Sequence, residues 1–288
     1  MRFGISVPNI GDLGTLIELG VEADRTGWDG YFLWDHMRFM KEFPVPVFDP
    51  WVALGAIAAR TERVRLGTLV TPVARRRPWK LARETVTLDH LSGGRAILGV
   101  GLGYPPDVDF ELLGEDPDDH VRAAKLDEGL EVLTRLWAGD PFDFEGEHFH
   151  VRETQFQPTP LQRPRIPIWV AGMWPNRAPF RRAARYDGVV PIRVDERGMP
   201  AALGADELAE LVAYVREHRT SDEPFDVVHG GSSEPDAMRA SATAGATWYL
   251  ADAGVEGPDW EEPTLELVRE GPPSAGGVRA SGRASPRP

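Results

Sequence analysis

The stretch "VRLGTLVTPVARRRPWKLARETVTLDHLSGGRAILGVGLGY", residues 64–104, contains a complete strand–helix–strand unit. Its apolar runs at 64–72 and 95–101 are continuous rather than alternating, whereas 78–94 repeats apolar residues at helical spacing and ends in two glycines. Continuous apolar runs joined by a helix are typical of parallel strands buried on both faces. The stretch therefore predicts an α/β fold built on a parallel sheet.

The same alternation extends over most of the chain. Runs that predict strands lie at 2–7, 29–34, 64–72, 95–101, 166–172, 187–192, 225–231 and 246–252. Stretches that predict helices lie at 13–27, 50–60, 78–94, 119–139, 176–186, 205–219, 235–245 and 260–270. Eight strand–helix units in 288 residues predict a (β/α)8 TIM barrel. An open doubly wound sheet is the alternative, although it usually needs fewer strands.

We expect a single domain over residues 1–270, with a small hairpin at 142–151. Residues 271–288 have no periodicity and are rich in Gly, Pro and Ser, which predicts a disordered tail.

Composition excludes several classes of function. The chain has no cysteine, so thiolate nucleophiles, disulfides and cysteine metal sites are ruled out. A formal net charge of −13 argues against nucleic-acid and anionic-membrane partners. No apolar run is long enough for a transmembrane helix or a secretory signal, so we expect a cytoplasmic protein.

The glycines after the fourth predicted strand are not a dinucleotide-binding fingerprint. Gly99, Gly101 and Gly103 are spaced G-x-G-x-G, and Tyr104 stands where the third glycine of G-x-G-x-x-G would open a helix. Two prolines follow, and they do not continue into a long helix. These glycines must therefore serve another purpose.

A barrel carries its chemistry at the carboxyl ends of its strands, which reduces the sequence to a short group of candidates. Asp35 and His36 end the second strand, and imidazole titrates near neutral pH, so we interpret this pair as catalytic. The alternative is that Asp35 caps a loop and His36 merely packs there. Trp34, Trp174 and His229 are further strand-end residues that we expect in a substrate pocket. The rest of the rim is apolar, which suits a flat aromatic ligand.

Two other clusters leave their function open. His148 and His150 have H-x-H spacing, but no third ligand is placed by spacing, so we interpret them as part of a solvated hairpin and predict no metal site. Arg75, Arg76 and Arg77 follow the third strand and either neutralise a phosphate or a charged cofactor tail, or form a solvated loop.

Five motifs in order resemble the luciferase-like monooxygenases, a family of barrels that use FMN or the deazaflavin F420. They are "WDH" (34–36), "RVRLGTLVTP" (63–72), "LSGGRAILGVGLG" (91–103), "LDEGLEVLTRLWAG" (126–139) and "QRPRIPIWVAG" (162–172). The stretch "WPNRAPFRRAARYDGVVPI" (174–192) is similar to a small subgroup of predicted oxidoreductases. The resemblance covers most of residues 1–260 and implies a bacterial-luciferase-like TIM barrel.

The resemblance also implies where a cofactor would lie. It places a non-proline cis peptide at Leu69–Val70, behind the cofactor ring, and it implies that the glycines of strand four let the backbone approach that ring. The residues that it places along the ring edge are Leu102, Gly103 and Tyr104. Those that it places toward the cofactor tail are Ala171, Gly172 and Met173, with Asn176 and Arg177 at the phosphate.

The implied activity is that of a flavin- or F420-dependent oxidoreductase or monooxygenase acting on an unidentified small organic substrate. An FMN enzyme would need a flavin reductase as partner, and the family implies a homodimer through outer helices. In the sugar-phosphate dehydrogenases of the family a glutamate acid occupies the place of Tyr104, so that activity is not expected. The alternatives are a non-catalytic flavin-binding barrel and a barrel lyase, which would want a strand-end lysine that this chain lacks.

Overall fold

The computed structural model describes residues 1–39, 41, 44–196, 200–231, 234–251 and 259–273. Its strands are β1 Arg2–Val7, β2 Gly30–Leu33, β3 Arg65–Pro72, β4 Ala96–Gly101, β5 Phe142–Glu145, β6 His150–Thr154, β7 Ile168–Met173, β8 Gly188–Val194, β9 Pro200–Ala201, β10 Asp226–Gly231 and β11 Trp248–Ala251. Its helices are α1 Leu13–Thr26, α2 Pro50–Ala58, α3 Pro78–Leu91, α4 Pro106–Asp109, α5 Asp119–Ala138, α6 Ala178–Ala183, α7 Ala205–His218, α8 Pro235–Ala244 and α9 Glu261–Glu270, with 3-10 turns η1 Val73–Arg75 and η2 Glu111–Leu113.

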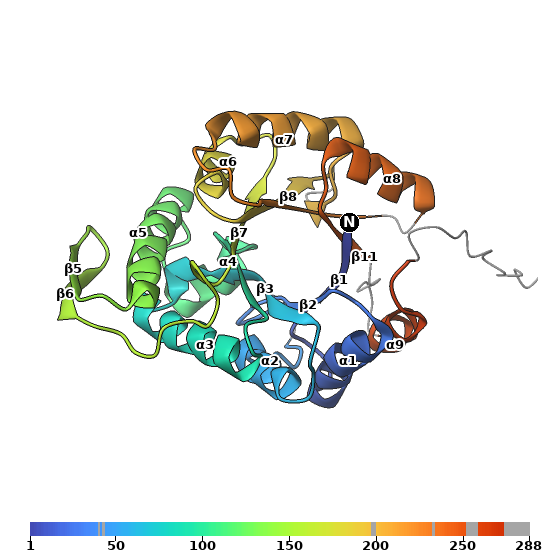
Figure 1. The fold of residues 1–288 in the computed structure, drawn as a ribbon, viewed down its shortest axis with the longest axis horizontal. Helices are drawn as coiled ribbons and strands as arrows, with labels where there is room; N and C mark the ends of the chain where they lie inside the picture. Colours follow the sequence, from blue (N-terminus) through green and yellow to red (C-terminus); the bar gives the residue numbers. More distant parts are fainter. Residues whose placement is uncertain (40, 42–43, 197–199, 232–233, 252–258, 274–288) are drawn as a thin grey trace, which may run out of the picture.

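Eight of these strands form a closed parallel barrel. They follow the order β10-β11-β1-β2-β3-β4-β7-β8, and a pairing of β8 with β10 closes the ring. Strand β9 adds to β8 in antiparallel orientation outside this ring. Figure 1 shows the larger helices surrounding the strands, with α9 beside α1. The predicted (β/α)8 barrel is therefore confirmed.

The helix boundaries follow from capping residues. Asp12 precedes α1 and accepts a hydrogen bond from the backbone N–H of Thr15 at 2.7 Å, and Gly27 ends that helix with a left-handed φ of 97°. Asp49 caps α2 in the same way ahead of Pro50 at the first helical position. These signals explain why the expected helices agree closely with the observed ones.

Several smaller features differ from the expectation or extend it. The predicted hairpin is formed by the antiparallel strands β5 and β6, which project beyond α5 (Figure 1). The two prolines after strand four open the one-turn helix α4, which the sequence did not predict. Of the predicted disordered tail, residues 274–288 lie outside the described residues. In the described part of the chain, no helix combines the length and apolar character that crossing a membrane requires.

Bulky side chains fill the amino-terminal half of the barrel interior. Phe32, Trp169 and Trp248 are fully buried there, and their ring centroids lie 5.2–6.0 Å apart. Alternate residues of a strand point to the same face, so the residues two positions further along line the next layer. On β7 and β10 these are the small residues Ala171 and Gly230, both partly exposed. Aromatic side chains therefore fill the lower part of the interior, and small, partly exposed residues line part of the layer above it.

Candidate active site at the barrel mouth

The floor of the barrel mouth is apolar. Leu69, Ala171 and Leu250 come from three strands, pack on the aromatic plug and are partly exposed on their other side. The peptide bond between Leu69 and Val70 is cis, as the family resemblance predicts. Because these side chains lie on a bulky aromatic plug, they form an apolar surface at the carboxyl ends of the strands. We call Leu69, Ala171 and Leu250 the mouth floor.

His36 lies beside this mouth, held through its backbone by a buried asparagine. Asn9 ends β1 with its side chain fully buried and accepts the N–H of His36 at 3.1 Å. The Asn9 amide group donates to the carbonyls of His36 at 2.9 Å and of Phe48 at 2.7 Å. The His36 ring packs against Trp34 and Phe39, with centroids 5.9 and 5.4 Å away. Trp34, expected in a substrate pocket, therefore contacts His36, expected to be catalytic, and both roles stay predictions.

The imidazole of His36 contacts a carboxylate that the sequence did not single out. Its Nδ1 lies 2.8 Å from Oδ2 of Asp109, at the end of the one-turn helix α4. Burial would raise the pKa of Asp109, but the hydrogen bond with His36 and the charge of Arg75 outweigh it and hold that pKa below its usual range. Asp109 is therefore an ionised, buried partner of His36.

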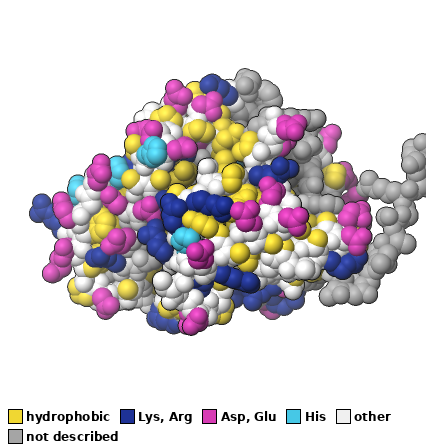
Figure 2. Space-filling view, turned by 90° about the horizontal axis from the view of Figure 1, so that it is seen from above, with side chains coloured by type: hydrophobic (Ala, Val, Ile, Leu, Met, Phe, Trp, Pro, Cys, Tyr) yellow, Lys and Arg dark blue, Asp and Glu magenta, His cyan; other side chains and the backbone are white. Residues whose placement is uncertain are grey.

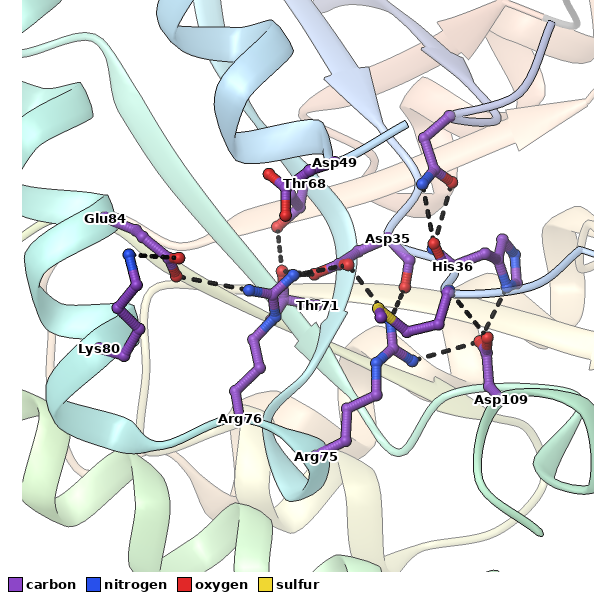
Figure 3. Close-up of polar contacts among 12 residues, drawn as sticks. Asp35, His36, Asp49, Thr68, Thr71, Arg75, Arg76, Lys80, Glu84 and Asp109 are labelled. Carbon is purple, nitrogen blue, oxygen red and sulfur yellow. Dashed lines mark hydrogen bonds and ion pairs between the residues drawn. The ribbon is translucent and has the colours of Figure 1, made fainter. Parts of the chain in front are cut away.

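The carboxylate of Asp35 is buried among polar side chains of the protein itself. Its carboxylate accepts the Thr71 hydroxyl at 2.8 Å and pairs with Arg76 at 2.8 Å and Arg75 at 3.2 Å. Arg75 continues to Asp109 at 3.3 Å, so one buried network joins the ends of β2, β3 and β4, with Asp109 between Arg75 and His36 (Figure 3). Asp35 therefore braces the site through these contacts, and the catalytic role expected for it stays a prediction.

The same network decides between the two interpretations of the arginine run. Arg75 and Arg76 point inward to Asp35, so they are neither solvated nor available to a phosphate. Arg77 is exposed and lies over the ring of Trp79. On the face drawn in Figure 2, basic side chains gather near the centre, beside apolar and acidic ones.

The glycines of strand four serve the protein's own packing. A Cβ at Gly99 would overlap the carbonyl oxygen of Thr68, and one at Gly101 would lie 2.9 Å from Val70 Cγ2. Gly103 has a φ of 86°, and a Cβ there would lie 2.8 Å from the Phe110 ring. The glycines are thus required by the bulge of β3, where the register shifts, and by the loop that carries Asp109. Close approach to a cofactor ring is not needed to explain them.

The loop after β4 is anchored from the helix layer. Arg122 of α5 is buried and donates to the carbonyls of Leu102 and Gly103, both at 2.8 Å. Leu102 and Gly103 are partly exposed at the mouth, and Tyr104 is 40% exposed. The three residues expected along a ring edge therefore lie together on the rim.

The structure does not bring His229 to the mouth. Its neighbour Val228 faces the barrel interior, so His229 faces the helices, where Nδ1 contacts Ser241 Oγ and Nε2 contacts the carbonyl of Leu203, both at 3.1 Å. Burial lowers the pKa of His229. Trp174 is also buried outside the mouth, against the ring of Phe180. These two predicted pocket residues belong to the outer packing.

The residues expected near a cofactor tail lie in two different surroundings. Gly172 and Met173 are partly exposed at the end of β7, next to the mouth floor. Arg177 lies between the rings of Trp174 and Tyr214, at 4.1 and 4.6 Å from their centroids, and pairs with Glu210 at 2.8 Å. Asn176 is exposed just before α6. A role for Asn176 and Arg177 at a phosphate stays a prediction.

The family model described as "Luciferase-like monooxygenase" matches residues 1–204, and the chain belongs to this family. It is 35% identical over 193 residues to an F420-dependent glucose-6-phosphate dehydrogenase of Microbacterium testaceum, covering 65% of this chain and 56% of that protein. The chain spans about half the length of the curated relatives that it matches.

Solved structures share the fold. The F420-dependent tetrahydromethanopterin reductase of Methanopyrus kandleri has a TM-score of 0.73 at 18% identity, covering 94% of this chain and 98% of that one. The oxygenating constituent of 3,6-diketocamphane monooxygenase of Pseudomonas putida, in complex with FMN, has a TM-score of 0.62 at 19% identity, covering 80% and 67%.

Proposed function

We propose that this chain is an F420- or FMN-dependent oxidoreductase whose cofactor ring lies on the mouth floor. The observation that carries the proposal is that His36 follows the carboxyl end of β2, at the same end of the barrel as the mouth floor, with its imidazole oriented by a buried carboxylate. Membership of the luciferase-like family and the activity for which the Microbacterium testaceum relative is named support it. The substrate is a small organic molecule whose identity the site does not specify.

The residues of the chain have distinct parts in this proposal. Leu69, Val70 and Ala171 support the ring from below, while the rim residues Leu102, Gly103 and Tyr104 follow its edge. Gly172 and Met173 extend toward the cofactor tail. A bound F420 or FMN would supply the redox chemistry, hydride transfer or the activation of oxygen. His36 would hold or move a proton at its ring, and the apolar floor with Trp34 would exclude water.

F420 is the first choice of cofactor because the curated relatives reported above are named for it. FMN is the second choice, supported by the Pseudomonas putida structure, and it would require a flavin reductase as partner.

The test is equilibrium binding of each cofactor, oxidised and reduced, followed by fluorescence. Saturable binding of F420 alone supports hydride transfer, and tight binding of reduced FMN supports oxygen chemistry. Dissociation constants above about 100 μM for both cofactors, roughly −5.5 kcal/mol, would refute the proposal.

We further propose that two copies of the chain pair through α2 and α3. Val52 on α2 is 72% exposed and Leu91 on α3 is 48% exposed, and Leu91 approaches Gly55 one turn after Val52. Large exposed side chains of this kind on adjacent helices support burial against a second copy. Light scattering is expected to give twice the mass of 31.8 kDa for the natural chain and the single mass for Val52→Glu. A monomeric natural chain would contradict the proposal.

A further inference from the structure

Asp109 makes four polar contacts on a side chain that is only 1% exposed. Its Oδ1 accepts the backbone N–H of Met37 at 3.0 Å and that of Arg38 at 3.4 Å. Its Oδ2 lies 2.8 Å from Nδ1 of His36 and 3.3 Å from Nη1 of Arg75. The two backbone groups follow His36 directly, so a single carboxylate fixes both the ring and the chain on its carboxyl side.

These contacts decide which ring nitrogen of His36 carries the proton in the neutral imidazole. An ionised carboxylate can only accept, so Nδ1 must donate to it. The other nitrogen, Nε2, makes no hydrogen bond with any residue that the structure describes. Nε2 is therefore left as an unprotonated acceptor.

We propose that Asp109 is a positioning residue that holds His36 in the Nδ1–H tautomer and leaves Nε2 as the nitrogen that takes up and releases a proton. This inference deepens the proposed function, because it makes neutral His36 a proton acceptor toward a ring or substrate and a donor only after it has been charged. A carboxylate behind an imidazole orients the ring and stabilises the charged form in the same way in other histidine sites.

The substitution Asp109→Asn provides a sharp test because the surrounding donors dictate how the amide lies. The backbone N–H groups of Met37 and Arg38 both donate to one oxygen position, whereas Arg75 alone donates to the other across 3.3 Å. The amide oxygen is therefore expected to stay with the two backbone N–H groups. The amide NH2 then faces Nδ1 of His36, and since NH2 also only donates, Nδ1 must become the acceptor. The proton is expected to move to Nε2.

Long-range ¹H–¹⁵N spectra of protein with ¹⁵N-labelled histidine read this tautomer directly, and His36→Gln identifies the His36 signals by their loss. The natural chain is expected to show Nδ1 as the protonated nitrogen, and Asp109→Asn to show Nε2 instead. Asp107→Asn is the matched control, because Asp107 lies on the same turn but is 44% exposed and pairs with Lys41. It should leave the tautomer unchanged.

An Nε2–H tautomer in the natural chain would overturn the proposal, and this measurement needs no variant that could fail to fold. An unchanged tautomer in folded Asp109→Asn would overturn it equally. The spectra are recorded without cofactor, so they are independent of the binding titration. If neither F420 nor FMN binds while His36 is found as Nδ1–H, the proposed function fails and the positioning role of Asp109 stands.

Discussion

Replacing Gly99 with alanine is expected to cost more stability than the size of one methyl group suggests. The added Cβ would overlap the Thr68 carbonyl oxygen and lie 2.6 Å from Leu69 Cδ2. Ordinary contacts between carbon atoms are about 3.5–4.0 Å, so β3 and β4 would have to separate locally by about 1 Å. The two strands are paired on both sides of this point and cannot move apart without losing hydrogen bonds. We expect a loss of about 3 kcal/mol, at the upper end of the range for overpacking.

The assay is urea unfolding followed by tryptophan fluorescence, with Gly55→Ala as the matched control. Gly55 is inside α2, and a Cβ there would meet no atom nearer than 4.0 Å. Alanine favours a helix interior over glycine by about 1 kcal/mol, so the control should be neutral or stabilising. If Gly99→Ala unfolds at the same urea concentration as the natural chain, the close approach of β3 and β4 is wrong.

Two further predictions concern buried polar groups. Arg75→Met leaves Asp109 and Asp35 with fewer partners and should destabilise the protein by about 3–5 kcal/mol, whereas exposed Arg77→Met should change stability by less than about 0.5 kcal/mol in urea unfolding. Burial lowers the pKa of His229 in the folded chain below its ordinary value of about 6.5. As the pH falls below that value, the unfolded chain binds a proton at His229 before the folded chain does, so the free energy of unfolding decreases. The decline of the unfolding free energy from about pH 7.5 to about pH 5.5 should therefore be shallower in His229→Gln, and an equal slope in both proteins would contradict this.

The barrel could be predicted from sequence because each of its strands is a continuous apolar run followed by a stretch with helical spacing, and α1 and α2 begin at aspartate caps. Because these runs are apolar at every position, the sequence does not indicate which residues of a strand face the barrel interior and which face the helices. On β10, Val228 and His229 are both buried, and only the structure shows that the first faces the interior and the second faces the helices. An apolar alternation would have revealed this, but strands buried on both faces have none.

Asp109 could not be predicted for a different reason. It lies 73 residues from His36 along the chain, on a single helical turn after two prolines. Local spacing carries no information on such a pairing, and the neighbouring carboxylates Asp107 and Glu111 offer no pattern that separates it. Asn9 follows the first strand, and its hydrogen bonds with the backbone of His36 depend on the pairing of β1 with β2.

The most direct test of the central claim is whether the mouth floor is where the cofactor binds. Ala171→Trp would fill the small layer above the aromatic plug, and Ala242→Trp places the same side chain on the exposed surface of α8. F420 and FMN are titrated against the natural chain and both variants, with unfolding curves to establish that all three are folded. We predict that the natural chain and Ala242→Trp bind a cofactor with equal affinity and that Ala171→Trp loses it. Unchanged binding by folded Ala171→Trp would contradict a cofactor on the mouth floor.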